Sequence, residues 1–251
     1  MLERPIGEGG MGIVYLAREE ALDRSVALKL LSPELAEDEV FRERFLEEMR
    51  LAASLEHPHV CPVYAAGEED GLLYLALRFV EGEDAASLVG REGPLRPEHA
   101  LALLGDLAGA LDQAHAHGLL HRDVKPENVL LDADSNAYLA DFGLARPLRR
   151  RASTQAGELE GTLLYLAPER IDGRDASPAS DEYAFACLAY FLLSGAPPFV
   201  RSHEAALLFA HLRDAPRYGD AVAWVGLAAI ADPDLLLPQI ASAIGDRKSV
   251  V

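Results

Sequence analysis

The chain has few cysteines and no long hydrophobic run. Only Cys61 and Cys187 are present among its 251 residues, and they form no CxxC pair. This number and spacing exclude a disulfide scaffold and a cysteine-based zinc site, and they predict two buried, reduced thiols in a cytoplasmic protein. The longest uncharged apolar runs, residues 183–193 and 221–231, are well short of the roughly 20 residues that a membrane span needs. We therefore expect no membrane segment in this chain.

Positive charge is also scarce. The sequence has 41 acidic side chains against 23 lysines and arginines, so its formal net charge is −18. Such a charge repels nucleic-acid backbones and anionic lipid, which argues against a nucleic-acid partner. A small anionic ligand remains compatible if a local cluster of donors holds it. The length and the 50% hydrophobic content indicate a folded chain of one or two domains with a sizeable core.

The hydrophobic pattern changes character along the chain. The first 31 residues alternate between apolar and polar side chains, as strands do, whereas residues 38–55 carry apolar side chains at helical spacing. After Gly82 the pattern becomes mostly helical. A sheet-rich segment followed by a helix-rich one predicts an α+β fold with two lobes. Further strands are predicted at residues 60–64, 72–79, 129–131 and 137–139, and further helices after Pro97 and at residues 183–193.

A glycine-rich segment lies near the start of the sequence. Residues 7–14 read GEGGMGIV and match the pattern GxGxxGxV. Glycines at these positions let backbone amides approach a phosphate, although a glycine loop alone is more often an ordinary turn. The segment lies between two predicted strands and not before a helix. That placement argues against the dinucleotide-binding use of such loops.

A lysine and a glutamate in the sheet-rich part form a candidate ion pair. Lys29 ends the apolar strand VALK, where a side chain that simply reaches solvent is an equally good interpretation. Glu48 lies three residues after Phe45 and four before Ala52, so its carboxylate shares a helix face with apolar side chains. A carboxylate on an inward face needs a cationic partner. We expect Lys29 to be that partner and the pair to fix the ammonium group for phosphate binding.

The densest group of polar residues is the segment HRDVKPEN at residues 121–128. A solvated loop could have this composition. An acidic residue, Asp141, follows a predicted strand eighteen positions after Asp123, and Gly143 follows closely. Asp123 could accept a hydroxyl proton, while Asn128 and Asp141 offer the hard oxygen ligands that Mg²⁺ prefers. Together these groups suit phosphoryl transfer.

Five motifs in this order resemble those of the eukaryotic-type protein kinases, specifically the bacterial Hanks-type serine/threonine kinases. The motifs are the glycine loop, the VALK lysine, HRD with its later asparagine, Asp141-Phe142-Gly143, and Ala167-Pro168-Glu169. The resemblance implies a bilobal kinase fold over residues 1–251, with a small antiparallel-sheet lobe over 1–80 and a larger helical lobe over 81–251. The match to the family extends from about residue 2 and fades after about residue 213.

The resemblance implies where ATP binds. The glycine loop would cover the nucleotide, Val14 and Ala27 would enclose the adenine, and Lys29 would hold the α- and β-phosphates. The backbone of residues 78–80 would form the hinge that reads adenine, next to Leu77 as the gatekeeper. The implied nucleotide-binding residues are Ile6, Gly7, Glu8, Gly9, Gly10, Met11, Gly12, Val14, Ala27, Lys29, Arg78, Val80, Asn128 and Asp141.

The resemblance also assigns the chemistry. It implies Asp123 as the catalytic base and Lys125 as a phosphate contact typical of serine/threonine kinases, with Lys29 and Glu48 completing the catalytic set. Asn128 and Asp141 would bind Mg²⁺, with Mn²⁺ left open as a substitute. Asp181 matches an aspartate that anchors the catalytic loop, although it could also be a helix N-cap.

The segment between Asp141 and Glu169 indicates regulation. A basic run at residues 149–151 precedes Ser153 and Thr154. A phosphate there would add about 1.5 to 2 negative charges and could pair with Arg122, which stands beside Asp123. We expect autophosphorylation at Thr154 and, as a second site, at Ser153, while an ordinary polar loop remains the alternative. Thr162 matches a threonine that orders the substrate loop in this family.

The expected function is that of a serine/threonine protein kinase that uses ATP and acts on protein substrates. A homodimer for autophosphorylation in trans is left open. The main alternative is a catalytically impaired nucleotide-binding protein or scaffold, because the segment after residue 213 departs from the family pattern and offers only Arg247 as a partner for Glu169. A small-molecule kinase is disfavoured, because Lys125 and the segment 161–169 belong to kinases of proteins.

Overall fold

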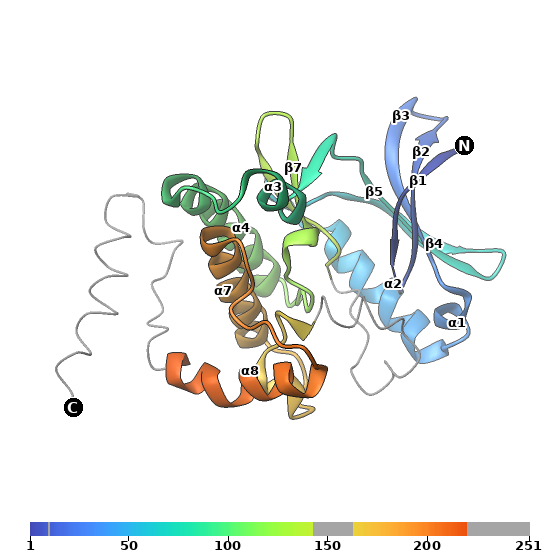
Figure 1. Ribbon diagram of the computed structural model, residues 1–251. Coiled ribbons are helices and arrows are strands. Elements are labelled where there is room, and N and C mark those ends of the chain that lie inside the picture. Colours follow the sequence, from blue (N-terminus) through green and yellow to red (C-terminus); the bar gives the residue numbers. More distant parts are fainter. Residues whose placement is uncertain (10, 143–162, 220–251) are drawn as a thin grey trace, which may run out of the picture.

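The computed structural model describes residues 1–9, 11–142 and 163–219, and within 214–219 only the backbone. These residues form a sheet-rich N-terminal lobe and a mostly helical C-terminal lobe, which lie side by side in Figure 1. The α+β architecture with two lobes agrees with the fold class predicted from the hydrophobic pattern.

An antiparallel sheet of five strands makes up most of the N-terminal lobe. Its strands occur in the order β1-β2-β3-β5-β4. Helix α2 packs beside this sheet (Figure 1). The strands are β1 (Leu2–Gly9), β2 (Gly12–Glu19), β3 (Arg24–Leu31), β4 (Val63–Glu69) and β5 (Leu72–Arg78), and the helices are α1 (Pro33–Ala36) and α2 (Glu39–Ala53).

Helix α2 forms where the sequence predicts it, for identifiable local reasons. Asp38 is its N-cap and accepts a hydrogen bond from the Phe41 amide at 3.3 Å, which satisfies one of the amides left free at a helix start. Phe45, Met49 and Ala52 recur on one face and are buried. The helix is therefore held by this apolar face, which turns the neighbouring Glu48 toward the interior.

The strand predicted at residues 60–64 begins later, at Val63, because Pro62 has no amide hydrogen to donate to a ladder. The preceding residues instead reach the C-terminal lobe. The Cys61 amide donates to Leu139 O at 2.9 Å, and the Leu139 amide donates to His59 O at 2.8 Å. These two bonds tie the end of the α2 connection to the strand that leads to Asp141.

The C-terminal lobe combines a small sheet with several helices. Strands β6 (Gly82–Asp84), β7 (Val129–Asp132) and β8 (Ala137–Leu139) form an antiparallel sheet in that order. Helices α4 and α7 run next to each other (Figure 1). The helical elements are α3 (Ala85–Glu92), α4 (Pro97–Ala116), the short 3-10 helix η1 (Pro126–Asn128), α6 (Pro168–Ile171), α7 (Pro178–Ser194) and α8 (Glu204–Gly219).

One apolar core extends through both lobes. It runs from Leu31 and Leu75 under the N-terminal sheet to Leu107, Leu139 and Leu188 in the C-terminal lobe. A separate small cluster lies beneath α8. Neither Cys61 nor Cys187 is in a disulfide, and burial raises the pKa of each thiol to about 12, as expected for inert core cysteines. Among the described helices, none is long and apolar enough to cross a membrane.

The start of β6 requires a glycine for steric reasons. A Cβ on Gly82 would lie 1.8 Å from the Leu131 carbonyl oxygen of the neighbouring strand. The two backbones therefore approach more closely than any side chain allows. Gly90 in α3 offers a contrast, because a Cβ there would meet nothing within 4 Å.

We predict opposite effects of the same substitution at these two glycines. Gly82→Ala should lower the free energy of unfolding by about 1–3 kcal/mol, because β6 must move away from β7. Gly90→Ala should raise it by up to about 1 kcal/mol, because alanine favours the helix. Urea denaturation of the two variants beside the wild type tests this. Equal stability of the two variants would refute the steric argument.

Candidate active site

The glycine loop forms the hairpin between β1 and β2, and Gly9 pairs with Gly12 across it. Gly12 has φ +143°, and a Cβ there would lie 1.9 Å from the Leu30 carbonyl oxygen of β3. The loop can therefore lie tightly on the sheet only with glycine at this position. Of the remaining predicted loop residues, Ile6 and Glu8 are exposed on β1 and Met11 packs against the core, while Gly10 lies outside the described residues.

The predicted adenine and phosphate residues lie on adjacent strands. Val14 on β2 is paired with Lys29 on β3, and Ala27 is paired with Leu77 on β5. Beyond β5, Val80 packs against the core. The predicted residues of the sheet thus share one region of the N-terminal lobe, next to the connection into the C-terminal lobe.

Lys29 is buried, and its partner is not the one predicted. Its ammonium Nζ lies 2.6 Å from Asp141 Oδ2, across the two lobes. Glu48, the expected partner, instead pairs with the guanidinium of Arg122 in the catalytic loop. The inward position of Glu48 was predicted correctly, but the choice of cation was wrong. A buried carboxylate pairs with whichever cation the packing brings nearest, and Asp141 already holds Lys29.

The catalytic loop is anchored by the buried carboxylate of Asp181 on α7. Asp181 accepts hydrogen bonds from the amides of His121 at 2.8 Å and Arg122 at 2.7 Å, and His115 Nε2 of α4 donates to it at 2.9 Å. Burial alone would raise the pKa of Asp181, but the bond from His115 and the charges and amides of the loop hold that pKa below its ordinary value. The α7 N-cap is Ser177, so the helix-cap interpretation of Asp181 is wrong.

Two site residues have left-handed backbone conformations that non-glycine residues rarely adopt. Arg122 has φ +67° and Asp141 has φ +64°. Such conformations cost about 1–3 kcal/mol each and persist only where the surroundings impose them. For Arg122 the restraint comes from the two hydrogen bonds that the amides of His121 and Arg122 donate to Asp181. For Asp141 the ion pair with Lys29 lies beside the strained backbone.

His121 is wholly buried and neutral. Its Nε2 donates to Ala140 O at 2.9 Å, and its Nδ1 accepts from the Asp123 amide at 3.3 Å. Burial lowers the pKa of His121, against the opposing charges of Asp181 and Asp123. Its ring also packs on Phe142, with ring centroids 4.6 Å apart. His121 therefore joins the catalytic loop to the segment that carries Asp141.

The side chain of Asp123 is held by two neighbours in its own loop. Lys125 Nζ lies 2.8 Å from Asp123 Oδ2, and Asn128 Nδ2 donates to the Asp123 carbonyl oxygen at 2.7 Å and to its Oδ2 at 3.2 Å. Burial would lower the pKa of Lys125, but the facing Asp123 carboxylate and nearby Glu127 raise it. Lys125 is therefore cationic beside the predicted base.

Asn128 and Asp141 are brought together by the backbone. The amide of Ala140, the residue before Asp141, donates to Asn128 O at 2.9 Å. Because the amide nitrogen of Asn128 faces Asp123, its side-chain oxygen is turned the other way. In the described part of the chain no three His, Cys, Asp or Glu side chains form a metal cage. A sparse pair of hard oxygen donors nevertheless fits Mg²⁺, which keeps waters and phosphate oxygens as its other ligands.

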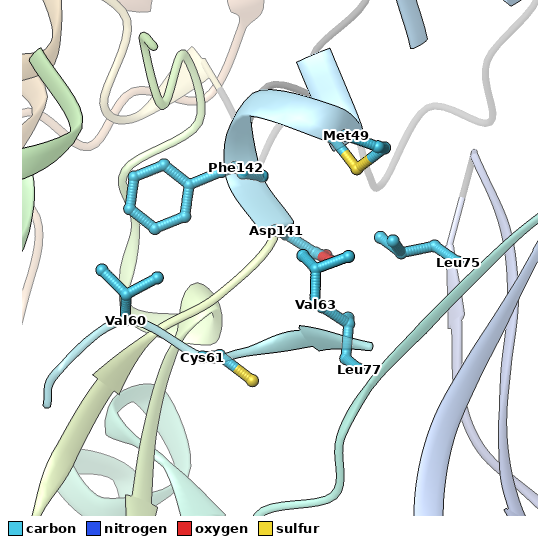
Figure 2. A pocket seen from close by; sticks show the side chains of 9 residues that line it. Met49, Val60, Cys61, Val63, Leu75, Leu77, Asp141 and Phe142 are labelled. Atoms are coloured by element: carbon cyan, nitrogen blue, oxygen red, sulfur yellow. The ribbon is translucent and has the colours of Figure 1, made fainter. Parts of the chain in front are cut away.

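An apolar cavity lies behind this site. Its accessible volume of about 10 Å³ is close to the minimum for one water molecule. Figure 2 shows the side chains that line it, among them Met49 of α2, Leu75 and Leu77 of β5, Asp141 and Phe142. The cavity joins the α2 face, the predicted gatekeeper and the Asp141 segment. Because these elements are closely packed, a shift of any one of them displaces the others.

Two residues that contact the site, His115 and Tyr138, were not predicted from the sequence. His115 donates to Asp181, and no motif marks it. Tyr138 lies under the guanidinium of Arg78, 4.8 Å from the ring centroid, and donates to Asp132 Oδ2 at 2.9 Å. Only the packed structure brings these residues to the site, because their partners are distant in the sequence.

Of the predicted regulatory residues, the structure describes Arg122 alone. Arg122 pairs with Glu48 as described above. Ser153, Thr154, Thr162 and Arg247 lie outside the described residues. The cation expected to meet a phosphate is thus held by a carboxylate of α2.

We predict that Asp181 is worth far more than an ordinary helix cap. Asp181→Ala should lower the free energy of unfolding by at least ~3 kcal/mol, because the amides of His121 and Arg122 and the ring N–H of His115 lose their hydrogen-bond acceptor. Asp38→Ala is the matched control and should cost about 1 kcal/mol, because Asp38 caps the start of α2 by accepting a hydrogen bond from the Phe41 amide. Chemical denaturation measures both. Equal losses would mean that the carboxylate does not anchor the loop.

Comparison with known proteins agrees with this geometry. The family model described as "Protein kinase domain" matches residues 1–222. The serine/threonine-protein kinase PknE of Mycobacterium tuberculosis is 45% identical over 214 residues, which are 85% of this chain and 38% of that protein. PknD of the same species is 43% identical over 213 residues, which are 85% of this chain and 32% of that protein. The matched part of the chain thus spans about a third of the length of these curated relatives.

A solved structure is similar as well. The crystal structure of the Mycobacterium tuberculosis PknI kinase domain matches with a TM-score of 0.69 and 35% sequence identity, over 98% of this chain and 94% of that one. Its likeness supports the bilobal fold. The chain therefore belongs to the protein kinase family, and its similar relatives are serine/threonine kinases.

Proposed function

We propose that this chain transfers the γ-phosphate of ATP to serine and threonine hydroxyls of proteins. The observation that carries the proposal is the network around Asp123, in which Lys125 and Asn128 both contact the carboxylate. Across the lobes, Lys29 and Asp141 form the second half of the site. The identity to serine/threonine kinases supports the reaction class, and no comparison favours the non-catalytic alternative.

Each residue of the network has a definite task in this reaction. Asp123 accepts the proton of the attacking hydroxyl, and Asn128 fixes the direction in which its carboxylate points. Lys125 is cationic next to the base and stabilises negative charge on the phosphoryl group as it moves. Lys29 binds phosphate oxygens of the nucleotide. In a chain of negative net charge, these two lysines supply the local positive charge that ATP requires.

We further propose Mg²⁺ as the metal, with Mn²⁺ as a substitute, held by Asn128 and Asp141. A bound divalent ion would neutralise charge on the phosphates. The residue assignments of the sequence analysis extend this proposal to the glycine loop and to the hinge at Arg78 and Val80. We treat residues 1–251 as one kinase domain, with lobes at 1–80 and 81–251, in a cytoplasmic protein that forms homodimers for autophosphorylation.

Phosphate incorporation from radiolabelled ATP into a generic protein substrate tests the reaction. Asp123→Asn should lower the rate by about 10²–10⁴-fold, because the base is lost. Lys29→Met should cause a loss of similar order. Asp134→Asn, in the exposed turn between β7 and β8, is the control and should keep wild-type activity. Equal incorporation by all four proteins would exclude catalysis at this site. A rise in melting temperature with Mg-ATP but no incorporation would favour the nucleotide-binding alternative.

Activity is proposed to depend on phosphorylation of the segment that contains Ser153 and Thr154. The supporting observation is the Glu48–Arg122 pair, which occupies both the carboxylate expected to position Lys29 and the cation expected to meet a phosphate. A phosphate near Arg122 competes with Glu48 for the guanidinium. Glu48 is then released toward Lys29.

Intact-mass spectrometry followed by peptide mapping tests this regulation. After incubation with Mg-ATP, the wild type should gain phosphate at Thr154 and, second, at Ser153, whereas Asp123→Asn should gain none. The Thr154→Ala variant should be less active than the wild type, because Glu48 then stays in its ion pair with Arg122. No phosphate within residues 149–162 of an active wild-type protein would contradict the proposal.

A further inference from the structure

Helix α7 carries two polar side chains that serve different segments. Asp181 anchors the catalytic loop. Two residues later, the Tyr183 hydroxyl lies 2.7 Å from His211 Nδ1 on α8. The same helix therefore connects the loop of the predicted base to α8.

His211 is wholly buried among aromatic side chains. Its ring packs edge-on against Phe199, with centroids 4.9 Å apart, and at a tilt against Tyr183, with centroids 5.8 Å apart. Burial lowers the pKa of His211 to about 4, so the ring is neutral at pH 7. A neutral imidazole carries one N–H. When the Tyr183 hydroxyl donates its hydrogen bond to Nδ1, the single N–H of the imidazole ring is on Nε2.

The segment that leads into α6 lies against α8 near His211, because Leu163 packs in one cluster with Leu207 and Ala210. His211 Nε2 makes no well-formed hydrogen bond with any described residue. The polar group facing it is the backbone of Leu163, which partly offsets the effect of burial on its pKa. A buried donor without a full partner is costly. An N–H directed at the Leu163 backbone therefore favours those positions of the segment that bring the carbonyl oxygen closer.

The segment of residues 163–166 borders the catalytic loop. Tyr165 is buried close enough to Glu127, two residues after Lys125, for that carboxylate to raise the tyrosine pKa together with burial. Leu163 itself packs in the small cluster with Phe199, Leu207 and Ala210 and not in the main core. The position of Leu163 is therefore set by α8, while Tyr165, two residues later, is buried in the main core that also contains Val124 of the catalytic loop.

We propose that Tyr183 and His211 are positioning residues that hold residues 163–166 in place for docking of the protein substrate. This inference rests on the proposed function, because it names residues that serve its acceptor side. Among the described residues, the pair contacts neither the glycine loop nor Lys29. It therefore acts on the KM for the protein substrate and leaves the KM for ATP unchanged.

Steady-state kinetics with ATP and with the protein substrate varied separately test this split. Tyr183→Phe and His211→Phe keep the aromatic packing and remove the hydrogen bond. Each should raise the KM for the protein about 3–10-fold, the range expected for one buried hydrogen bond. The KM for ATP should stay within a factor of about two. The double variant should be no worse than His211→Phe alone, because that substitution already removes both the bond to Tyr183 and the N–H directed at Leu163.

Two further variants separate positioning from simple core stability. His211→Gln keeps an acceptor and a donor on a shorter side chain and should recover part of the lost KM. Tyr190→Phe makes the same deletion on α7 at an exposed position and should change nothing. An equal rise of both KM values, or a fall in kcat with a wild-type protein KM, would overturn the proposal.

Amide hydrogen exchange tests the pair independently of catalysis. In His211→Phe, the amides of residues 163–166 should exchange faster than in the wild type, while those of residues 121–123 should keep their protection through Asp181. Unchanged exchange at 163–166 would overturn the proposal even if the kinase is active. Faster exchange at 163–166 in His211→Phe, together with a wild-type protein that has no kinase activity, would instead refute the proposed function and leave the positioning role standing.

Discussion

The catalytic loop depends on one buried carboxylate. Asp181 accepts hydrogen bonds from the amides of His121 and Arg122 and from the ring of His115, and so holds Arg122 at a positive φ. Because a carboxylate with three donors stays ionised when buried, the anchor is strong and directional. Asp123 comes next in the chain. Its position relative to the lobes thus follows from a helix that contributes no side chain to the reacting atoms.

The site between the lobes has few cationic side chains. The chain has an excess of acidic groups, yet the site gathers its cations at a few positions. Lys29 pairs with Asp141, Lys125 with Asp123, and Arg122 with Glu48. Each cation of the site is matched by a carboxylate. An incoming phosphate must therefore exchange partners with these carboxylates, and this exchange makes the site responsive to nucleotide and to phosphorylation.

Much of the site was predictable because its residues are close in sequence. Asp123, Lys125 and Asn128 lie within one loop, and their mutual contacts follow from that spacing. The expected Lys29–Glu48 pair was wrong, because a helix period shows that Glu48 faces inward but not which cation lies there. The strand predicted at residues 60–64 began late for a local reason, the missing amide of Pro62.

The sequence by itself determined the two lobes, the strands and helices, the buried cysteines and the set of reactive side chains. Those features depend on local periodicity, on glycine sterics and on residue type. Tertiary structure alone decided which distant groups meet: Asp181 with the catalytic loop, Tyr183 with His211, and Arg78 with Tyr138. Buried polar groups must find partners, but the packing of the helices and strands selects them.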